Sequence, residues 1–362
     1  MYNKDELLLI WIDSFDFLDN ETKQILFSKL KNEKDYKNFL SVNKETVINA
    51  IKEENYNKLI YSANQDYLDY HLKLYDKNCI RALTIQSKDY PSILKETDCP
   101  PLVLYAKGDI ELLKTEKFAI VGSRKSLPLS INIAKDFAEH LSKSFTLITG
   151  IAEGVDSAVI ETALKNDRKV ISILAGGFFH VYPKSNTAIF ETVAKKGLVL
   201  SENPPEVKPK PYFFPVRNRI IAGLSKGTLI INGGEKSGVY STAEYAGVYG
   251  KDIFAIPYNI NIPSGVAPNK IIKDGGILIT SPSEISEFYG IDIKENEEAE
   301  FSNEEREIID CIKEQPKHVD LICKELDKEI FMIMPYITML EIKGYIVKNG
   351  VNIYGIVKRT EK

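Results

Sequence analysis

The residues best suited to chemistry in this chain lie between positions 205 and 226. This segment holds five cations against one acid, Glu206, and sets three adjacent aromatic residues, Tyr212, Phe213 and Phe214, beside them. The cations are Lys208, Lys210, Arg217, Arg219 and Lys226. Rings that stack on bases, next to cations that neutralise phosphates, are typical of sites for single-stranded nucleic acid. The residues alone leave a second interpretation open, in which Phe213 and Phe214 pack beneath a sheet.

A second candidate is Arg124, which follows Gly122 and Ser123 at the end of an apolar run. Glycine lets a ligand approach the backbone, and the start of a helix offers free N–H groups to an anion. Only seven of the 47 basic residues are arginines, so an arginine here suggests a need for a planar, bidentate donor. We expect Arg124 to contact a phosphate; a surface arginine after a structural glycine is the alternative.

Further turns with the same character follow later apolar runs. They contain Gly150, Gly154 and Asp156; Lys184 and Asn186; and Ser237 and Thr242. Backbone N–H groups and hydroxyls make such turns receptive to anions. Asp156 could cap a helix or act as a catalytic acid, and the sequence leaves both roles open. Several anion-receptive turns at one sheet edge suit a chain of phosphates better than a single mononucleotide.

The elements that must position these residues alternate between short apolar runs and helical stretches. Runs rich in β-branched residues lie at 118–121, 145–148, 170–174, 198–200, 228–231, 253–256 and 277–279, and helical stretches lie at 129–141, 157–165, 188–196 and 242–248. Apolar runs that alternate with helices predict strands buried on both faces. The predicted fold is therefore α/β, with a doubly wound, mostly parallel sheet whose ligands lie at the carboxyl ends of the strands.

Two smaller parts flank this core. Residues 1–80 carry apolar residues at helical spacing and predict a helical domain. The polar stretch 291–300 is the expected linker between the core, 81–290, and a tail, 301–362. The tail predicts helices at 304–313, 319–327 and 334–343, then a hairpin that turns at 348–350, which is the order of a winged-helix domain. Because the tail holds 10 basic against 11 acidic residues, we expect it to contact protein rather than DNA.

Composition excludes several classes. The formal charge of −4 gives no global attraction to DNA or to an anionic membrane, so a nucleic-acid site must be local. No signal peptide or membrane-spanning run is recognisable. The four cysteines, Cys79, Cys99, Cys311 and Cys323, form no CxxC motif and suggest reduced thiols in the cytoplasm. We expect no metal site and no cofactor, because the histidines and cysteines are scattered.

The motifs together resemble the family of DNA-processing protein A, also called DprA or Smf. The resemblance covers about residues 85–285 and rests on GSR at 122–124, TGIAEGVD at 149–156, YPKSN at 182–186, FPVRNRIIAGLS at 214–225 and SGVYSTAEYA at 237–246. It implies an extended Rossmann-like core, with a helical (SAM-like) domain before it. It also implies sequence-independent binding of single-stranded DNA, without catalytic turnover, by a homodimer that loads RecA recombinase during natural transformation. The residues that inherit the DNA-contact role are Arg124, Lys184, Asn186, Phe214, Arg217, Asn218 and Arg219. The resemblance places the dimer contact around 271–278.

This chain departs from the family pattern at several positions. Glu153 stands where the family has arginine, Val159-Ile160 where it has an alanine-histidine pair, and Asn232-Gly233 where it has glutamate-alanine. The stretch from Asn232 to Glu244 is also similar to the glycine-rich turn of phosphoribohydrolases. A nucleotide-binding sensor or a phosphoribohydrolase-like enzyme on the same core is therefore the alternative function. No convincing acid/base pair supports it, so we expect a binding protein and not an enzyme.

Overall fold

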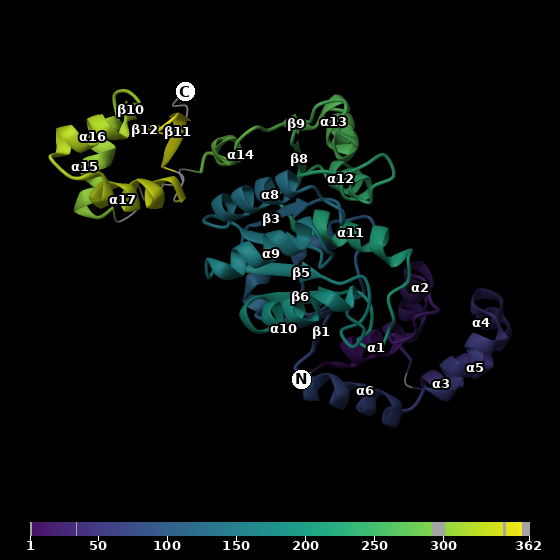
Figure 1. Cartoon of the computed structure of the whole chain (residues 1–362). Helices are drawn as coiled ribbons and strands as arrows, with labels where there is room; N and C mark the ends of the chain where they lie inside the picture. Colours follow the sequence, from purple (N-terminus) through teal and green to yellow (C-terminus); the bar gives the residue numbers. More distant parts are fainter. Residues whose placement is uncertain (1, 34, 292–300, 343–344, 357–362) are drawn as a thin grey trace. The chain divides into compact units, whose positions relative to one another are not determined.

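The structure is a computed structural model that describes residues 2–33, 35–291, 301–342 and 345–356, and it divides into two compact units, Met1–Ile293 and Lys294–Lys362. Each unit is described by itself. All but the first residue of the expected linker, 291–300, lies outside the described residues. Figure 1 labels many of the helices and strands of both units.

The first unit is built on a nine-stranded sheet with the order β1-β2-β6-β5-β4-β3-β7-β8-β9. The strands are β1 (Arg81–Thr84), β2 (Val103–Gly108), β3 (Lys117–Val121), β4 (Thr146–Thr149), β5 (Val170–Ile173), β6 (Leu198–Ser201), β7 (Gly227–Ile230), β8 (Asp252–Ala255) and β9 (Ile277–Leu278). Strands β3 to β9 pair in parallel, whereas β2 runs antiparallel to both β1 and β6. The predicted doubly wound, mostly parallel sheet is confirmed. The edge strand β1 and its antiparallel neighbour β2 were not predicted.

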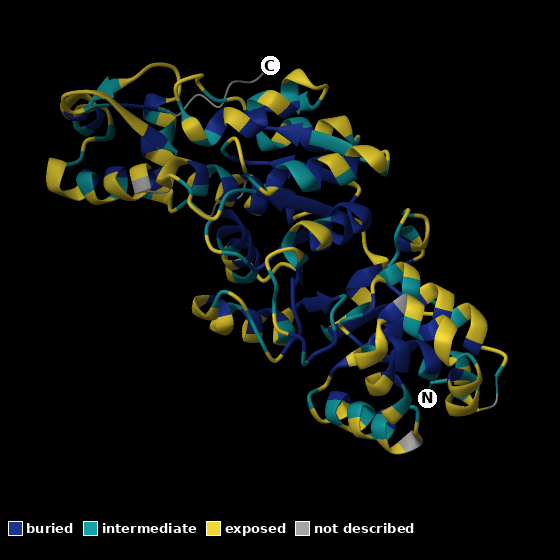
Figure 2. Ribbon diagram, turned by 90° about the vertical axis from the view of Figure 1, so that its right-hand side faces the viewer, coloured by how far each residue is buried: buried dark blue, intermediate teal, exposed yellow. Residues whose placement is uncertain are grey.

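Helices cover both faces of this sheet because its central strands are apolar on both sides. Alternate side chains of a strand point to opposite faces: Phe118 and Ile120 of β3 join one hydrophobic cluster, and Ala119 and Val121 join another. The first cluster includes side chains of α8 (Pro128–Leu141), α9 (Val155–Lys165), α10 (Thr187–Lys196) and α14 (Pro282–Phe288). The second includes side chains of α7 (Ser92–Lys95), α11 (Phe213–Leu224), α12 (Val239–Val248) and α13 (Val266–Lys273). Figure 2 shows the strands as the buried layer between partly exposed helices.

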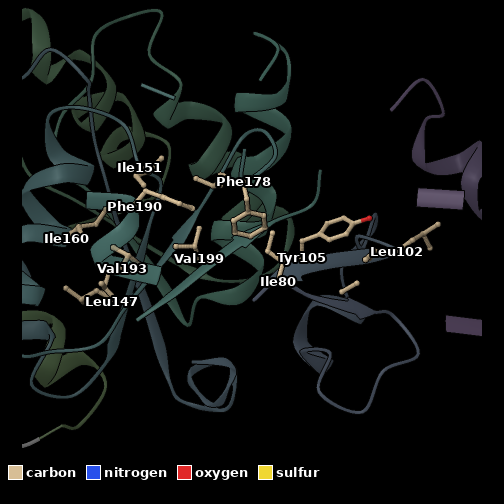
Figure 3. Packing of buried hydrophobic residues seen from close by; sticks show 14 of the residues in the cluster. Ile80, Leu102, Tyr105, Leu147, Ile151, Ile160, Phe178, Phe190, Val193 and Val199 are labelled. Atoms are coloured by element: carbon tan, nitrogen blue, oxygen red, sulfur yellow. The ribbon is translucent and has the colours of Figure 1, made fainter. Parts of the chain in front are cut away.

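Six helices precede the sheet and share its core. They are α1 (Lys4–Asp13), α2 (Asn20–Leu30), α3 (Tyr36–Val42), α4 (Lys44–Ile51), α5 (Glu53–Tyr61) and α6 (Gln65–Lys77). The middle of α1, 8–12, is at most 3% exposed and belongs to the same hydrophobic cluster as β3. Figure 3 shows part of this cluster, with Tyr105 of β2 near Ile80 and Phe178. The helical segment therefore packs on the sheet as part of one unit.

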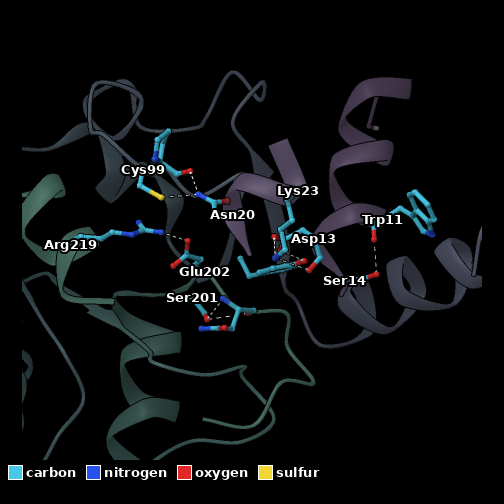
Figure 4. A network of polar contacts seen from close by, with 12 residues as sticks. Trp11, Asp13, Ser14, Asn20, Lys23, Cys99, Ser201, Glu202 and Arg219 are labelled. Atoms are coloured by element: carbon cyan, nitrogen blue, oxygen red, sulfur yellow. Dashed lines mark hydrogen bonds and ion pairs between the residues drawn. The ribbon is translucent and has the colours of Figure 1, made fainter. Parts of the chain in front are cut away.

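Buried polar contacts reinforce this junction (Figure 4). Asp13, at the end of α1, forms an ion pair with Lys23 of α2 at 2.8 Å. The Tyr105 hydroxyl donates to the other carboxylate oxygen of Asp13 at 3.0 Å. A buried carboxylate is costly unless it is paired and hydrogen-bonded, so these two partners stabilise Asp13 in its buried position.

The second unit has the element order of a winged helix. It contains α15 (Asn303–Ile312), β10 (Lys317–His318), α16 (Val319–Leu326), α17 (Ile330–Ile342), β11 (Ile346–Gly350) and β12 (Ile353–Ile356), with an antiparallel sheet in the order β10-β12-β11. The hairpin turns at 351–352 and not at the predicted 348–350. Asn352 adopts φ of 55°, which asparagine tolerates better than most residues, and this allows the tight turn after β11.

No helix in the described ranges is long and apolar enough to span a membrane.

Candidate functional site

The site lies where the strand order reverses, between β3 and β7. In open α/β sheets the crevice outside the carboxyl ends of the strands at this switch point is the usual ligand site. The loop after β3 carries Arg124, and the loop after β7 contains Asn232. Helix α11 connects the parallel strands β6 and β7, so it begins near the carboxyl end of β6. Its first turn, with Phe213 and Phe214, therefore lies at the same edge of the sheet.

Arg124 and two aromatic rings form an exposed cluster at this edge. The guanidinium carbon of Arg124 lies 4.5 Å from the ring centroid of Phe214 and 6.0 Å from that of Tyr182. The two rings meet edge to face, with centroids 5.8 Å apart. Arg124 is exposed, Tyr182 is 50% exposed and Phe214 is half-buried. Neither Phe213 nor Phe214 joins a hydrophobic cluster among the described residues, so the geometry favours a surface role for Phe214.

A small pocket opens beside this cluster. Its lining residues are Arg124, Ile151, Ala152, Glu153, Ala175, Tyr182, Pro183, Phe214 and Arg217, and its volume is about 50 Å³. This space suits one or two water molecules and is far below the roughly 300 Å³ or more of a typical small-molecule site. A ligand at this edge would therefore lie across the surface and project a small group, such as a phosphate oxygen, into the pocket.

Arg217 forms part of the pocket wall from within the protein. It is 8% exposed, and its guanidinium donates to the carbonyl of Ile173 at the end of β5. A Cβ atom on Gly150 would lie 2.3 Å from the Asp156 carboxylate and 2.7 Å from the Arg217 guanidinium, so only glycine fits between these groups. Burial lowers the pKa of Arg217 to about 10, and burial raises the pKa of Asp156.

The Asp156 side chain has a local structural role. It accepts a hydrogen bond from the backbone N–H of Ala152 at 3.2 Å, within the turn that leads into α9. Gly154 precedes it with φ of 82°, and a Cβ there would lie 2.4 Å from the carbonyl oxygen of Ser123. The start of α9 therefore packs closely against the backbone next to Arg124. The hydrogen bond from Ala152 to Asp156 stabilises the turn that makes this contact.

Asn232 organises the loop that carries Arg124. Its side chain is fully buried, and its Oδ1 accepts a hydrogen bond from the Ser123 backbone N–H at 2.8 Å. Its Nδ2 donates to the Ser126 hydroxyl at 2.9 Å. A Cβ on Gly122 would lie 2.8 Å from the same Oδ1. Gly122 and Ser123 thus lie against the Asn232 side chain, which holds the loop in place. The Ser123 N–H is bonded within the protein and does not point to a ligand.

The segment before α10 contributes one exposed cation and one buried polar side chain. Lys184 is exposed, whereas Asn186 is buried and donates to the Ile151 carbonyl at 2.8 Å. Between them, the Ser185 hydroxyl donates to the Glu153 carboxylate at 2.7 Å. Glu153 therefore places a negative charge in the pocket wall shared with Arg124.

Two of the cations predicted to contact DNA form ion pairs with acidic residues outside the pocket. Arg219 is 5% exposed and forms an ion pair with Glu202, close to the junction with the N-terminal helices (Figure 4). Lys210 forms an ion pair with Asp16 at 2.8 Å, with both side chains about 40% exposed. Arg219 is thus directed into the protein, while Lys210 remains near the surface.

The remaining predicted residues lie on the α12 side and do not line the pocket. Asn218 donates to the Ser241 hydroxyl at 2.9 Å and so links α11 to α12. Thr242 is buried, and Ser237 is half-buried in the turn before α12. The pocket instead includes Tyr182 and Glu153, which were not among the predicted site residues. Tyr182 could have been predicted from the sequence, because it is an aromatic residue in the same turn as Lys184 and Asn186. Glu153 could not, because its charge is opposite to that of a phosphate-binding residue.

The described residues contain no cluster of three or more histidine, cysteine, aspartate or glutamate side chains that could hold a metal ion. The strand order and the site at the switch point define a doubly wound, Rossmann-like α/β protein. The sequence profile of the family described as DNA recombination-mediator protein A matches residues 81–290. This match covers more than half of the chain, and the chain belongs to that family.

Individual relatives agree with this assignment. DNA processing protein DprA of Bacillus subtilis (strain 168) is 38% identical over 218 residues, which are 60% of this chain and 73% of that protein. The X-ray structure of DprA from Streptococcus pneumoniae matches with a TM-score of 0.61 and 27% identity, over 74% of this chain and 97% of that one. DNA processing protein A from Helicobacter pylori, whose structure was studied for its single-stranded DNA binding mode, matches with a TM-score of 0.52 and 30% identity, over 58% and 95%.

Proposed function

We propose that this protein binds single-stranded DNA without sequence preference and loads RecA recombinase onto it, in the cytoplasm, during natural transformation or recombination. The observation that carries the proposal is the exposed guanidinium of Arg124 against the ring of Phe214. The single-stranded DNA binding of the H. pylori relative supports it.

The chemistry of the site suits a strand that lies along the sheet edge. Arg124 and Lys184 are exposed cations that can contact phosphates. Tyr182 and Phe214 offer ring faces on which bases can stack, and every base has such a face. Phosphates and stacked rings carry no sequence information, which accounts for the proposed lack of preference. The proposal contains no catalytic step.

The protein acts as a homodimer in this proposal. Strand β9 is an edge of the sheet, and Leu278 within it is 47% exposed. An edge strand with an exposed apolar side chain suits pairing with a second copy. Light scattering at working concentration should therefore give twice the mass of the chain, and Leu278→Lys should lower that mass. A monomeric wild-type protein would contradict this part.

The test of DNA binding compares Phe214→Ala with Tyr212→Ala by anisotropy of a labelled oligo-dT. Loss of a stacked base should weaken binding by about 1–3 kcal/mol in Phe214→Ala. Tyr212 immediately precedes α11 and is 57% exposed, but it lies against Phe213, so Tyr212→Ala is the matched control and should bind like the wild type. Equal affinity of the two variants would remove Phe214 from the site. If the folded wild-type protein does not bind, nucleotide titrations would test the sensor or phosphoribohydrolase-like alternative.

RecA loading needs its own assay. On a strand coated with single-strand binding protein, the wild-type protein should speed RecA filament formation, and Arg124→Ala should not. If both proteins speed filament formation to the same extent, RecA loading does not depend on Arg124 or on the proposed site.

A further inference from the structure

Helix α17 of the C-terminal unit is apolar on two opposite sides. Ile333, Ile337 and Leu340 are at most 1% exposed and form part of the core of the unit. Phe331 is 72% exposed and Met332 is 50% exposed. A helix that packs on one side only normally has polar residues on the other. The exposed apolar side of α17 therefore indicates a surface that another molecule covers.

The composition of α17 argues against DNA as that molecule. In a helix-turn-helix arrangement the recognition helix lies in the major groove, and cations nearby contact phosphates. The sequence of α17, IFMIMPYITMLEI, contains no lysine or arginine and one acid, Glu341. A helix of this composition would bring apolar side chains and a negative charge towards the phosphates.

A pocket lies beside the exposed side of α17. It is lined by Glu304, Ile308, Leu326, Lys328, Phe331, Met332, Ile333, Pro335 and Tyr336, and its volume is about 380 Å³. A volume above about 300 Å³ suits one or two large apolar side chains. Methionine and phenylalanine side chains adapt to the shape of a partner and are common at protein-binding surfaces.

The rim of this pocket is acidic. Glu304 lines it from the first turn of α15. Lys328, a cation on the rim, forms an ion pair with Glu307. The neighbours of Lys328 in the chain, Asp327 and Glu329, are both exposed acids. The lining itself holds one acid and one cation, Glu304 and Lys328. Together with Glu307, Asp327 and Glu329, which contact Lys328 or adjoin it in the chain, they form an acidic rim beside an apolar centre. Such a rim complements a partner with the opposite arrangement.

We propose that this pocket and the exposed side of α17 form a docking site for a basic amphipathic helix of a partner protein. A helix can insert apolar side chains spaced at i, i+3 and i+4 into a groove, while its lysines and arginines meet the acidic rim. The site lies wholly within the C-terminal unit, so it does not depend on DNA binding by the sheet edge.

The test uses the full chain and two labelled peptides. Both have about 18 residues and the same leucine positions at helical spacing, but one carries lysines and the other glutamates elsewhere. By anisotropy the lysine peptide should bind, and the glutamate peptide should bind roughly tenfold more weakly or worse, as charge complementarity requires. Phe331→Ser should weaken the lysine peptide roughly tenfold, as expected for an apolar anchor.

Two further variants keep the test specific. Val351 is 83% exposed in the same unit but lies on the hairpin turn, so Val351→Ser should bind the lysine peptide like the wild type. Glu329→Lys should weaken that peptide and strengthen the glutamate peptide. Equal binding of both peptides, or binding that Phe331→Ser does not change, would overturn the proposal. A protein mass that falls in Phe331→Ser would instead assign the surface to a second copy of this chain, and binding of phospholipid vesicles that this variant abolishes would assign it to a membrane.

Discussion

Replacing Arg124 by alanine should separate the proposed DNA binding from stability, because the side chain is exposed. Arg124 is exposed, and its contact with Phe214 at 4.5 Å is a cation–π interaction. At an exposed site such a contact contributes about 0.5–1 kcal/mol. The variant should therefore unfold only slightly more easily than the wild type.

The loss of DNA affinity should be larger than this loss of stability. A hydrogen bond to a charged group contributes about 1.5–3 kcal/mol, which corresponds to roughly 10- to 150-fold in affinity for one lost phosphate contact. The same contact contributes about −0.7 to the slope of log K against log salt on a single strand. Arg124→Ala should flatten the slope by that amount on oligonucleotides of any sequence.

Arg217→Met is the informative contrast because this arginine is buried. Removing it leaves the Ile173 carbonyl without its side-chain donor and a buried Asp156 without its nearby cation. Breaking such a buried arrangement costs about 3–5 kcal/mol. The variant should therefore lose folded protein, and its binding should fall only in proportion to that loss.

The assay is anisotropy of labelled oligo-dT at four salt concentrations, with urea unfolding of each variant. An unchanged salt slope in a folded Arg124→Ala protein would refute the assignment of a phosphate to this side chain. A sequence-selective loss would refute it equally, because a phosphate contact is blind to the base. A fully stable Arg217→Met protein that has lost DNA binding would show that Arg217 contacts the strand directly.

Three further outcomes are expected. Asn232→Ala removes the hydrogen bonds to the Ser123 N–H and the Ser126 hydroxyl, each worth about 0.5–1.5 kcal/mol of stability. Its effect on DNA affinity should vanish in the Arg124→Ala background, and additive effects in a double-mutant cycle would contradict its positioning role. Asp16→Asn frees Lys210 from a surface ion pair, so DNA affinity should rise and the salt slope should steepen by about 0.7; unchanged titrations would place Lys210 away from the strand. Burial and a hydrogen bond to a carboxylate raise the pKa of Cys311 to about 11, so at pH 8 only about a thousandth of this thiol is thiolate. Mass spectrometry should show that Cys311 is alkylated much more slowly in the folded protein than in urea. Equal rates in the two states would contradict this environment.

Much of the fold could be predicted because the sheet depends on local signals. Apolar runs such as 118–121 and 170–174 coincide with strands because a strand buried on both faces needs apolar residues at every position. Strands β1 and β2 escaped prediction because they lie at the antiparallel end of the sheet. Their place depends on the pairing of β2 with β6, which is distant in the chain.

The candidate site was only partly predictable, because residue type does not specify burial. The sequence correctly grouped Arg124 with Phe214, since both follow elements that end at the same sheet edge. It grouped Arg217 and Arg219 with them, yet both are buried. Their partners, Ile173 and Glu202, lie 44 and 17 residues away in the chain, and only the folded sheet brings them together.

The bond between Tyr105 and Asp13 joins residues that are 92 positions apart, and this separation has a consequence during synthesis. At about 5–20 residues per second, Tyr105 leaves the ribosome roughly 5–20 s after Asp13. Throughout that interval α1, whose middle is buried in the finished protein, has no sheet to cover it. The first helices of the nascent chain therefore form a natural substrate for chaperones, and they reach their final packing only after β2 has been made.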